Sequence, residues 1–193
     1  MLIEDLIQSK STTLQLVPYA LRSTCSQFLA DSASYPLYRS LPVTYSTFHR
    51  VKVRAKKQPT SLVNEVMNRA FECDYSKLSQ RAIFTHPMPT AVNEQTEPFY
   101  VFPINGYKFM YSKEVQNSNN DYTKLIDTLF EQFADGRVVG ELATDLLKSS
   151  YVNHKLTEGI ESNAEIVIYG IPYYYAVRVN DFPSYGKLLN HIQ

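Results

Sequence analysis

The stretch of sequence that decides the fold is FYVFPINGYKFMYS, residues 99–112. Two runs within it, FYVFPI (99–104) and YKFMYS (107–112), are rich in the aromatic and β-branched residues that favour strands. Asn105 and Gly106 separate these runs, and an Asn-Gly pair in such a position is typical of a β-hairpin. The sequence therefore predicts antiparallel β-structure near the centre of the chain.

Further strands are expected on both sides of this pair, because runs of similar composition recur before and after it. They are YPLYRSLP (35–42), FHRVKVR (48–54), RAIFTH (81–86), EIVIYG (165–170) and YYYAVRV (173–179). The last two are expected to form a terminal strand pair.

Helices are expected first at the N-terminal end of the chain. Leu21, Phe28 and Leu29 belong to an apolar stripe with helical spacing in residues 1–33. We expect this segment to form a helical layer that buries these side chains against a core formed by residues 34–193. Isolated helices of this length are marginal in water, so the layer must pack on something.

More helices are expected between the strands. Thr60 is a suitable N-cap for one of them, and a second apolar stripe runs from Asp121 as a possible cap to Gly136 as a stop. A weaker helix is expected over residues 140–149. Helices first, then strands with helices between them, favour an α+β fold over an alternating parallel sheet.

The composition excludes several classes of function. Nineteen Lys and Arg residues balance nineteen Asp and Glu residues, so no net charge draws the protein to nucleic acid or anionic lipid. With six glycines, the chain contains neither GxGxxG nor GxxxxGK[ST], the glycine-rich phosphate motifs. No apolar run approaches the roughly 20 residues of a membrane span, and MLIEDLIQSK at the start lacks the basic region of a secretory signal. We therefore expect a soluble, cytoplasmic protein with no membrane partner.

Metal and nucleophile chemistry are also disfavoured. The four histidines show no HxH, HxxxH or HExxH spacing, and the two cysteines form no CxxC motif, so no metal site is expected. Cys25 and Cys73 are interpreted as small buried thiols. The run HRVKVRAKK (49–57) is strongly basic, but a solvated strand edge protected by charge is favoured over a nucleic-acid groove.

Three residues on separate expected strands form a constellation with a chemical meaning. Arg39 lies in PLYRSLP, Thr85 in RAIFTH, and Glu165 opens EIVIYG. Arginine provides a rigid fork of donors for phosphate oxygens. A glutamate can bind a ribose hydroxyl and stabilise positive charge that develops at the anomeric carbon. Together these residues suit the cleavage of an N-glycosidic bond through an oxocarbenium-like state.

This ordered set resembles the ADP-ribosyltransferase superfamily, in particular its arginine–serine/threonine–glutamate branch. LYRS (37–40) resembles the first-strand motif of that branch, and NAEIVIYG (163–170) resembles its Gln/Glu-x-Glu motif followed by an apolar strand. The segments KVRAKKQPTS, RAIFTHP and FYVFPINGYKFMYS are similar to those of small phage-encoded proteins of this fold. The resemblance covers roughly residues 35 to 180 in motif order.

The resemblance implies a split antiparallel β core under an N-terminal helical layer. It also implies NAD as substrate, no metal, and transfer of ADP-ribose to a macromolecular acceptor, either a host protein or nucleic acid in the cytoplasm of an infected host. Arg39 would hold the pyrophosphate, with Ser40 beside it in the cofactor site. Thr85 would position Glu165, and Glu165 would bind the nicotinamide ribose. Asn163 would face the acceptor.

Each of these residues also has a simpler structural interpretation. Arg39 can pair with an acidic neighbour at the sheet edge, Thr85 can be an ordinary strand residue, and Glu165 can border its strand as a surface acid like Glu161. In the middle motif His86 stands where the branch has a second serine, so only Thr85 is carried over. The ring that would stack on nicotinamide is not assigned.

Two other functions remain open alongside the transferase. The first is a catalytically silent protein of the same fold that binds a nucleotide or a host partner, because one fold can serve several functions. The second is an accessory virion component whose tyrosine-rich strands serve assembly. Release of nicotinamide from NAD distinguishes the transferase from both.

Overall fold

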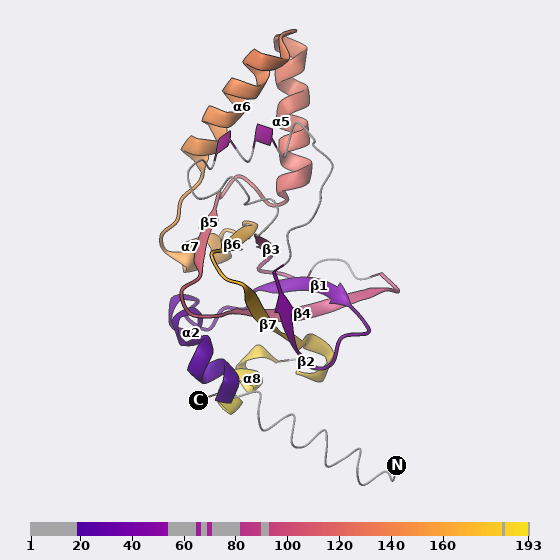
Figure 1. Ribbon diagram of the computed structural model, residues 1–193, viewed down its shortest axis with the longest axis vertical. Helices are drawn as coiled ribbons and strands as arrows, with labels where there is room; N and C mark the ends of the chain where they lie inside the picture. Colours follow the sequence, from indigo (N-terminus) through magenta and orange to yellow (C-terminus); the bar gives the residue numbers. More distant parts are fainter. Residues whose placement is uncertain are drawn as a thin grey trace.

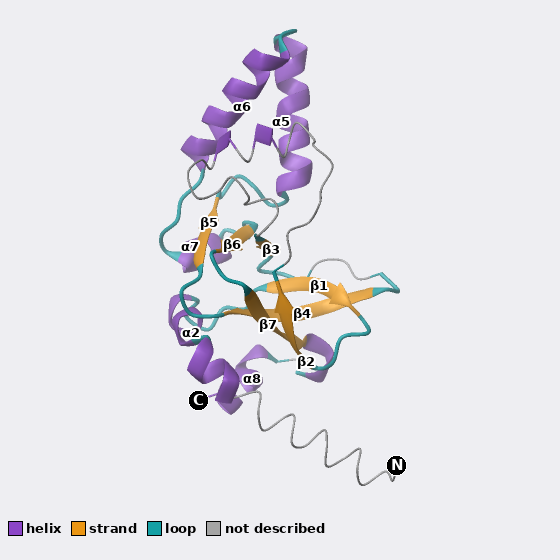
Figure 2. Ribbon diagram, viewed as in Figure 1, coloured by secondary structure: helices purple, strands orange, loops and turns teal. Residues whose placement is uncertain are grey.

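The computed structural model describes residues 19–53, 65–66, 69–70, 82–89, 93–182 and 184–192. Within them, helices combine with two antiparallel β-sheets (Figure 2), which confirms the predicted α+β class. The expected helix before Tyr19, the cap at Thr60 and Cys73 lie outside the described residues.

The described strands form a larger and a smaller antiparallel sheet. The larger sheet has the strand order β1-β4-β7-β2, and the smaller sheet has the order β3-β6-β5. The strands are β1 (Tyr38–Pro42), β2 (Phe48–Lys52), β3 (Ile83–Thr85), β4 (Thr96–Pro103), β5 (Lys108–Tyr111), β6 (Ile166–Tyr169) and β7 (Tyr173–Arg178).

Four of the helices lie at the two ends of the β-structure. The two long helices α5 and α6 form a hairpin that projects from one end, whereas α2 and α8 lie at the other end (Figure 1). The named helices are α2 (Ser26–Asp31), α5 (Ser118–Gln132), α6 (Gly136–Ser150), α7 (Leu156–Glu161), the short 3-10 helix η1 (Val179–Asp181) and α8 (Tyr185–Ile192). Residues 19–24 form a further helical turn ahead of α2.

A single bent ribbon connects the two sheets. In the larger sheet Pro103 of β4 is paired with Tyr174 of β7, and in the smaller sheet Lys108 of β5 is paired with Tyr169 of β6. Five positions separate these pairs on both segments, from 103 to 108 and from 174 to 169, so the register continues across the bend. Strands β4 and β5 therefore pair with β7 and β6 as one antiparallel ribbon whose halves belong to different sheets.

Two glycines form the bend. Gly106 has φ +85° and Gly170 has φ +83°, a left-handed conformation that other residues adopt only at an energetic cost. The two corners are close together, since a Cβ built on Gly170 would lie 3.8 Å from the carbonyl oxygen of Gly106. Both segments of the ribbon thus change sheets at the same place.

The predicted hairpin at Asn105 and Gly106 is therefore wrong, because β4 and β5 pair with β7 and β6 rather than with each other. Helix α2 holds this turn: Asn105 Oδ1 accepts a hydrogen bond from Gln27 N, and Gly106 N donates one to Gln27 Oε1, both at 2.9 Å. The predicted terminal strand pair is wrong for the same reason, since β6 and β7 lie in different sheets. The Asn-Gly pair supplies a local turn, but long-range contacts decide which strands pair.

A second junction joins the sheets through β1 and β3. Tyr38 N donates to His86 O at 2.7 Å, and His86 N donates to Tyr38 O at 2.9 Å. This isolated bridge lies one residue beyond the end of β3. It brings the first strand of the larger sheet beside the smaller sheet.

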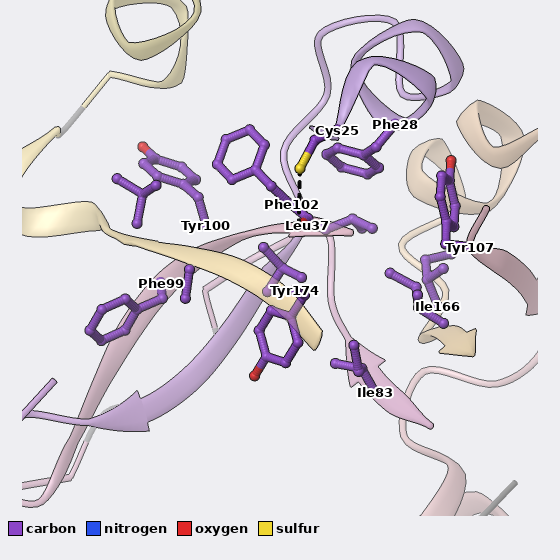
Figure 3. Packing of buried hydrophobic residues seen from close by; sticks show 14 of the residues in the cluster. Cys25, Phe28, Leu37, Ile83, Phe99, Tyr100, Phe102, Tyr107, Ile166 and Tyr174 are labelled. Atoms are coloured by element: carbon purple, nitrogen blue, oxygen red, sulfur yellow. Dashed lines mark hydrogen bonds between the residues drawn. The ribbon is translucent and has the colours of Figure 1, made fainter. Parts of the chain in front are cut away.

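The main core is aromatic. Phe28 of α2 packs edge-on against Phe102 of β4 with ring centroids 6.0 Å apart (Figure 3). Leu21 and Phe28 are fully buried and Leu29 is half-buried against the same cluster, as expected from the helical stripe. The helical residues from Tyr19 to Asp31 thus cover one part of the β-structure.

Cys25 belongs to this core. It is fully buried, and its Sγ donates a hydrogen bond to the carbonyl oxygen of Phe102 at 3.6 Å (Figure 3). Burial raises the pKa of the Cys25 thiol to about 12, so it stays protonated at neutral pH. The prediction of a buried, unreactive thiol is confirmed for Cys25.

The ends of the two long helices differ from the prediction. Helix α5 begins before Asp121, because Asn117 is its N-cap and accepts a hydrogen bond from Asn120 N at 3.1 Å. Gly136 does not stop this helix but starts α6, whose N-cap Asp135 accepts from Arg137 N at 2.8 Å. Asn and Asp are preferred N-cap residues, and the apolar pattern alone does not show where these caps lie.

We predict that Gly106→Ala lowers the free energy of unfolding by roughly 1–2 kcal/mol. No atom lies within 4 Å of a Cβ built on Gly106, so the loss reports the left-handed backbone alone. Gly186→Ala in α8 is the control, because its Cβ has ordinary contacts and alanine favours helix. Equilibrium unfolding in urea measures both. Equal stability of Gly106→Ala and the wild type would contradict the account of the bend.

Candidate active site

Arg39, Thr85 and Glu165 lie on, or directly before, strands that follow one another across the junction of the two sheets. Arg39 is in β1, Thr85 is the last residue of β3, and Glu165 directly precedes β6. Strand β3 pairs with β6 and is bridged to β1 at the residue after Thr85. The sheet topology thus brings together three segments that are far apart in the sequence.

The carboxylate of Glu165 is buried and attached to the start of helix α5. Its residue is 4% exposed, and Oε1 accepts a hydrogen bond from Ser118 N, the first backbone amide of that helix, at 3.1 Å. A carboxylate at this position stabilises the positive end of the helix dipole. Burial, and to a lesser degree the charge of Asp121, raise the pKa of Glu165, whereas the hydrogen bonds from Ser118 oppose this shift.

His86 lies beside this carboxylate. Its Nε2 is 3.6 Å from Glu165 Oε2, and the imidazole is more exposed than the carboxylate, with 21% against 5% of the side chain accessible. Burial lowers the pKa of His86, and the positive charge of Arg39 lowers it further. The imidazole is therefore neutral at pH 7, and its contact with Glu165 is not an ion pair.

The sequence prediction did not include His86 in the site. The register explains its position: Thr85 is paired with Ile166, so the next position places His86 opposite Glu165 on the same face of the smaller sheet. No pattern in the sequence predicts that these two segments pair. The alternation of side chains along RAIFTH would identify His86 only after that pairing is known.

Thr85 is fully buried, and its hydroxyl donates a hydrogen bond to the carbonyl oxygen of Ile166 at 3.0 Å. This bond fixes the end of β3 to the first residue of β6, next to Glu165. The Thr85 hydroxyl thus binds the backbone next to Glu165 rather than the Glu165 carboxylate itself. Its side chain is not accessible to a ligand in this conformation.

Arg39 is half-buried and has no ion pair with any carboxylate of the described residues. Alternation along β1 places it on the opposite face from Tyr38, the residue bridged to His86. Arg39 and Glu165 therefore do not lie on one face. The positive charge of Arg39 acts on His86 and on the buried Tyr174, which places the guanidinium near the junction of the sheets.

Ser40 and Asn163 are the remaining residues of the predicted site. Ser40 is half-buried in β1, where it is paired with Pro98 of β4. Asn163 has φ +56° and follows helix α7, where its N–H donates to Ile160 O at 3.0 Å. Asparagine is one of the few residues that readily end a helix in this left-handed conformation. The helix end therefore explains Asn163 without reference to an acceptor.

Two tyrosines complete the polar surroundings of Glu165. The hydroxyl of Tyr122 in α5 donates a hydrogen bond to that of Tyr151, which follows α6. Burial is the main cause that raises the pKa of both phenols, and the negative charge of Glu165 raises both further. Glu165 thus belongs to a buried polar cluster at the base of the helical hairpin, where water has little access.

Neither a metal centre nor a membrane segment occurs in the part of the chain that the structure describes. No group of three or more His, Cys, Asp or Glu side chains there could hold a metal ion, and no helix there is long and apolar enough to cross a membrane. A separate surface hollow of about 290 Å³ lies on α6, and its lining residues do not include the cluster around Glu165.

Comparisons with protein-family models, with curated proteins and with solved structures found no match for this chain.

We predict that Glu165→Ala and Glu165→Gln differ in stability. Glu165→Ala leaves the N–H of Ser118 without its acceptor and should lower the free energy of unfolding by about 1–2 kcal/mol at neutral pH. Glu165→Gln keeps an acceptor and removes a charge whose burial is unfavourable, so its loss should be much smaller. Urea unfolding of both variants measures the difference. Equal losses of stability would show that the negative charge of Glu165, rather than its hydrogen bond, stabilises helix α5.

The pH dependence provides a second measurement on the same variants. The folded-state pKa of Glu165 is raised, so its contribution to stability is complete below the unfolded-state pKa and is lost as the pH rises through the folded-state value. The wild type should therefore gain stability relative to Glu165→Gln as the pH falls from neutral toward the ordinary pKa of glutamate, about 4.3. A relative loss over this range would mean that the ionised carboxylate is the favoured form.

Proposed function

We propose that this protein transfers ADP-ribose from NAD to a macromolecular acceptor. The observation that carries the proposal is the succession of β1, β3 and β6 across the junction of the sheets, since Arg39 in β1, Thr85 in β3 and Glu165 directly before β6 occur in the order of the resembled family. The antiparallel sheets that meet in a bend also agree with the split core that this family implies.

In this proposal Arg39 binds the pyrophosphate of NAD. Its guanidinium has no carboxylate partner among the described residues, and its fork of donors would form charge-assisted hydrogen bonds with phosphate oxygens. Because Arg39 and Glu165 lie on different faces, NAD would have to extend across the junction of the sheets to contact both. An extended dinucleotide is suited to such a site.

Glu165 would bind the ribose next to nicotinamide. The bond between the nicotinamide nitrogen and the anomeric carbon breaks, nicotinamide leaves with the bonding electrons, and the acceptor forms the new bond and loses a proton. The ionised carboxylate would stabilise the positive charge that develops at the anomeric carbon. The first amide of α5 orients this carboxylate through a hydrogen bond to Oε1, and His86 lies beside Oε2.

The burial of Glu165 favours a second function, a catalytically silent protein of the same fold that binds a nucleotide. At 4% exposure the residue is engaged by Ser118 on one carboxylate oxygen and lies close to His86 on the other. A carboxylate that only supports helix α5 needs no contact with substrate. Turnover distinguishes the two functions, because both allow NAD to bind.

We predict that Glu165→Gln lowers the rate of nicotinamide release roughly 100- to 1,000-fold while NAD binding changes little, because the charge that stabilises the transition state is lost. Arg39→Ala should instead weaken NAD binding. Calorimetry measures the affinity, and release of labelled nicotinamide measures turnover.

Glu161→Gln is the matched control for Glu165→Gln, since Glu161 is an exposed acid four residues earlier that accepts a hydrogen bond from the hydroxyl of Tyr35. Its turnover should equal that of the wild type. Equal turnover of Glu165→Gln and the wild type would exclude the proposed mechanism. NAD binding without wild-type turnover would establish the silent protein instead.

We also predict that His86 positions Glu165. His86→Leu removes the polar contact with the carboxylate and should lower kcat by up to about 100-fold with little change in KM. His86→Gln keeps a donor near the position of Nε2 and should restore most of the activity. Steady-state kinetics of both variants distinguish a positioning role from a role in stability alone. An equal decrease of kcat in His86→Leu and His86→Gln would contradict the positioning role.

A further inference from the structure

Strand β2, at the edge of the larger sheet, carries basic and aromatic side chains on one face. Alternation places Phe48, Arg50 and Lys52 on the same side of β2. In the register with β7, Arg50 is paired with Tyr175 and Lys52 with Tyr173, so these tyrosines share that face. We call these five residues the aromatic–basic strip.

The side chains of the strip contact one another in a regular order. The ring of Phe48 stacks on that of Tyr175, with centroids 5.0 Å apart and planes 14° apart. The guanidinium carbon of Arg50 lies 5.1 Å from the ring centroid of Tyr173, and the two tyrosine rings meet edge-on at 5.8 Å. Two cations of the edge strand thus lie beside three aromatic rings, and one of these cations is stacked on a ring.

The cations of the strip are available to an anionic partner. Arg50 and Lys52 are exposed, and neither forms an ion pair with a carboxylate of the described residues. The three rings are half-buried, so each keeps part of its surface in solvent. The sequence prediction favoured a charged edge that merely prevents strand pairing, but such an edge does not require aromatic rings beside each cation.

We propose that the aromatic–basic strip binds single-stranded nucleic acid. Arg50 and Lys52 contact phosphates, and the solvent-facing part of the Tyr173 ring provides a surface on which a base stacks, while Phe48 and Tyr175 support it from below. An acidic peptide would use the two cations but leave the rings unused, so nucleic acid fits the strip better. The site is separate from Arg39 and Glu165, and its binding needs no NAD.

The test uses the full chain and a labelled oligothymidylate of about 15 nucleotides, with affinity measured by fluorescence anisotropy without NAD. Two phosphate contacts on a single strand predict a weakening of about sevenfold between about 50 and about 200 mM salt. The double variant Arg50→Ala/Lys52→Ala should lose most of the binding and most of this salt dependence. The matched control Lys124→Ala/Arg137→Ala removes one lysine and one arginine from the helical hairpin and should bind as the wild type does.

Tyr173 tests the contribution of stacking. Tyr173→Leu should weaken binding roughly 5- to 150-fold, and Tyr173→Phe, which keeps the ring, should retain it. Thermal melting shows whether each variant is folded. If Tyr173→Leu does not fold, the double variant Arg50→Ala/Lys52→Ala, which changes exposed residues, still tests the proposal. The proposal is overturned by wild-type binding that is absent at low salt, by equal binding of the two double variants, or by polyglutamate that competes as well as the oligonucleotide.

Discussion

The left-handed backbone at Gly106 and Gly170 is the constraint on which the rest of the structure depends. At these two residues the ribbon formed by β4–β5 and β6–β7 bends and passes from the larger to the smaller sheet without a change of register. The bend separates the sheets, and the Tyr38–His86 bridge joins them again at a second place. Between these two connections, β1, β3 and β6 become neighbours.

The position of Glu165 follows from this arrangement. It directly precedes β6, so the bend and the pairing with β3 determine where its carboxylate lies, and the start of helix α5 meets it there. Burial opposes the ionised form, whereas the helix amide favours it. In the proposed reaction this carboxylate, when ionised, would stabilise the transient positive charge at the anomeric carbon. The same contacts also support the helical hairpin, so stability and the proposed chemistry depend on one residue.

The local patterns in the sequence predicted the strands and most helices, because composition and periodicity report on each element separately. They predicted Arg39 and Thr85 within strands and the burial of Cys25 and Phe28, whereas the strand that Glu165 was expected to open begins one residue later, at Ile166. The pairings were not predictable in this way. The Asn105-Gly106 turn has the local signature of a hairpin, yet its two strands find partners in the C-terminal part of the chain. His86 likewise could not be predicted from the local pattern, since only the register of β3 with β6 places it beside Glu165.

We propose that NAD lies across the junction of the two sheets, between Arg39 and Glu165. A crystal structure of the Glu165→Gln variant soaked with NAD tests this claim most directly, because the substrate should remain intact. We expect density for the pyrophosphate at the Arg39 guanidinium and for the nicotinamide ribose at residue 165. A dinucleotide bound elsewhere, or a junction that stays empty at saturating NAD, would contradict the account.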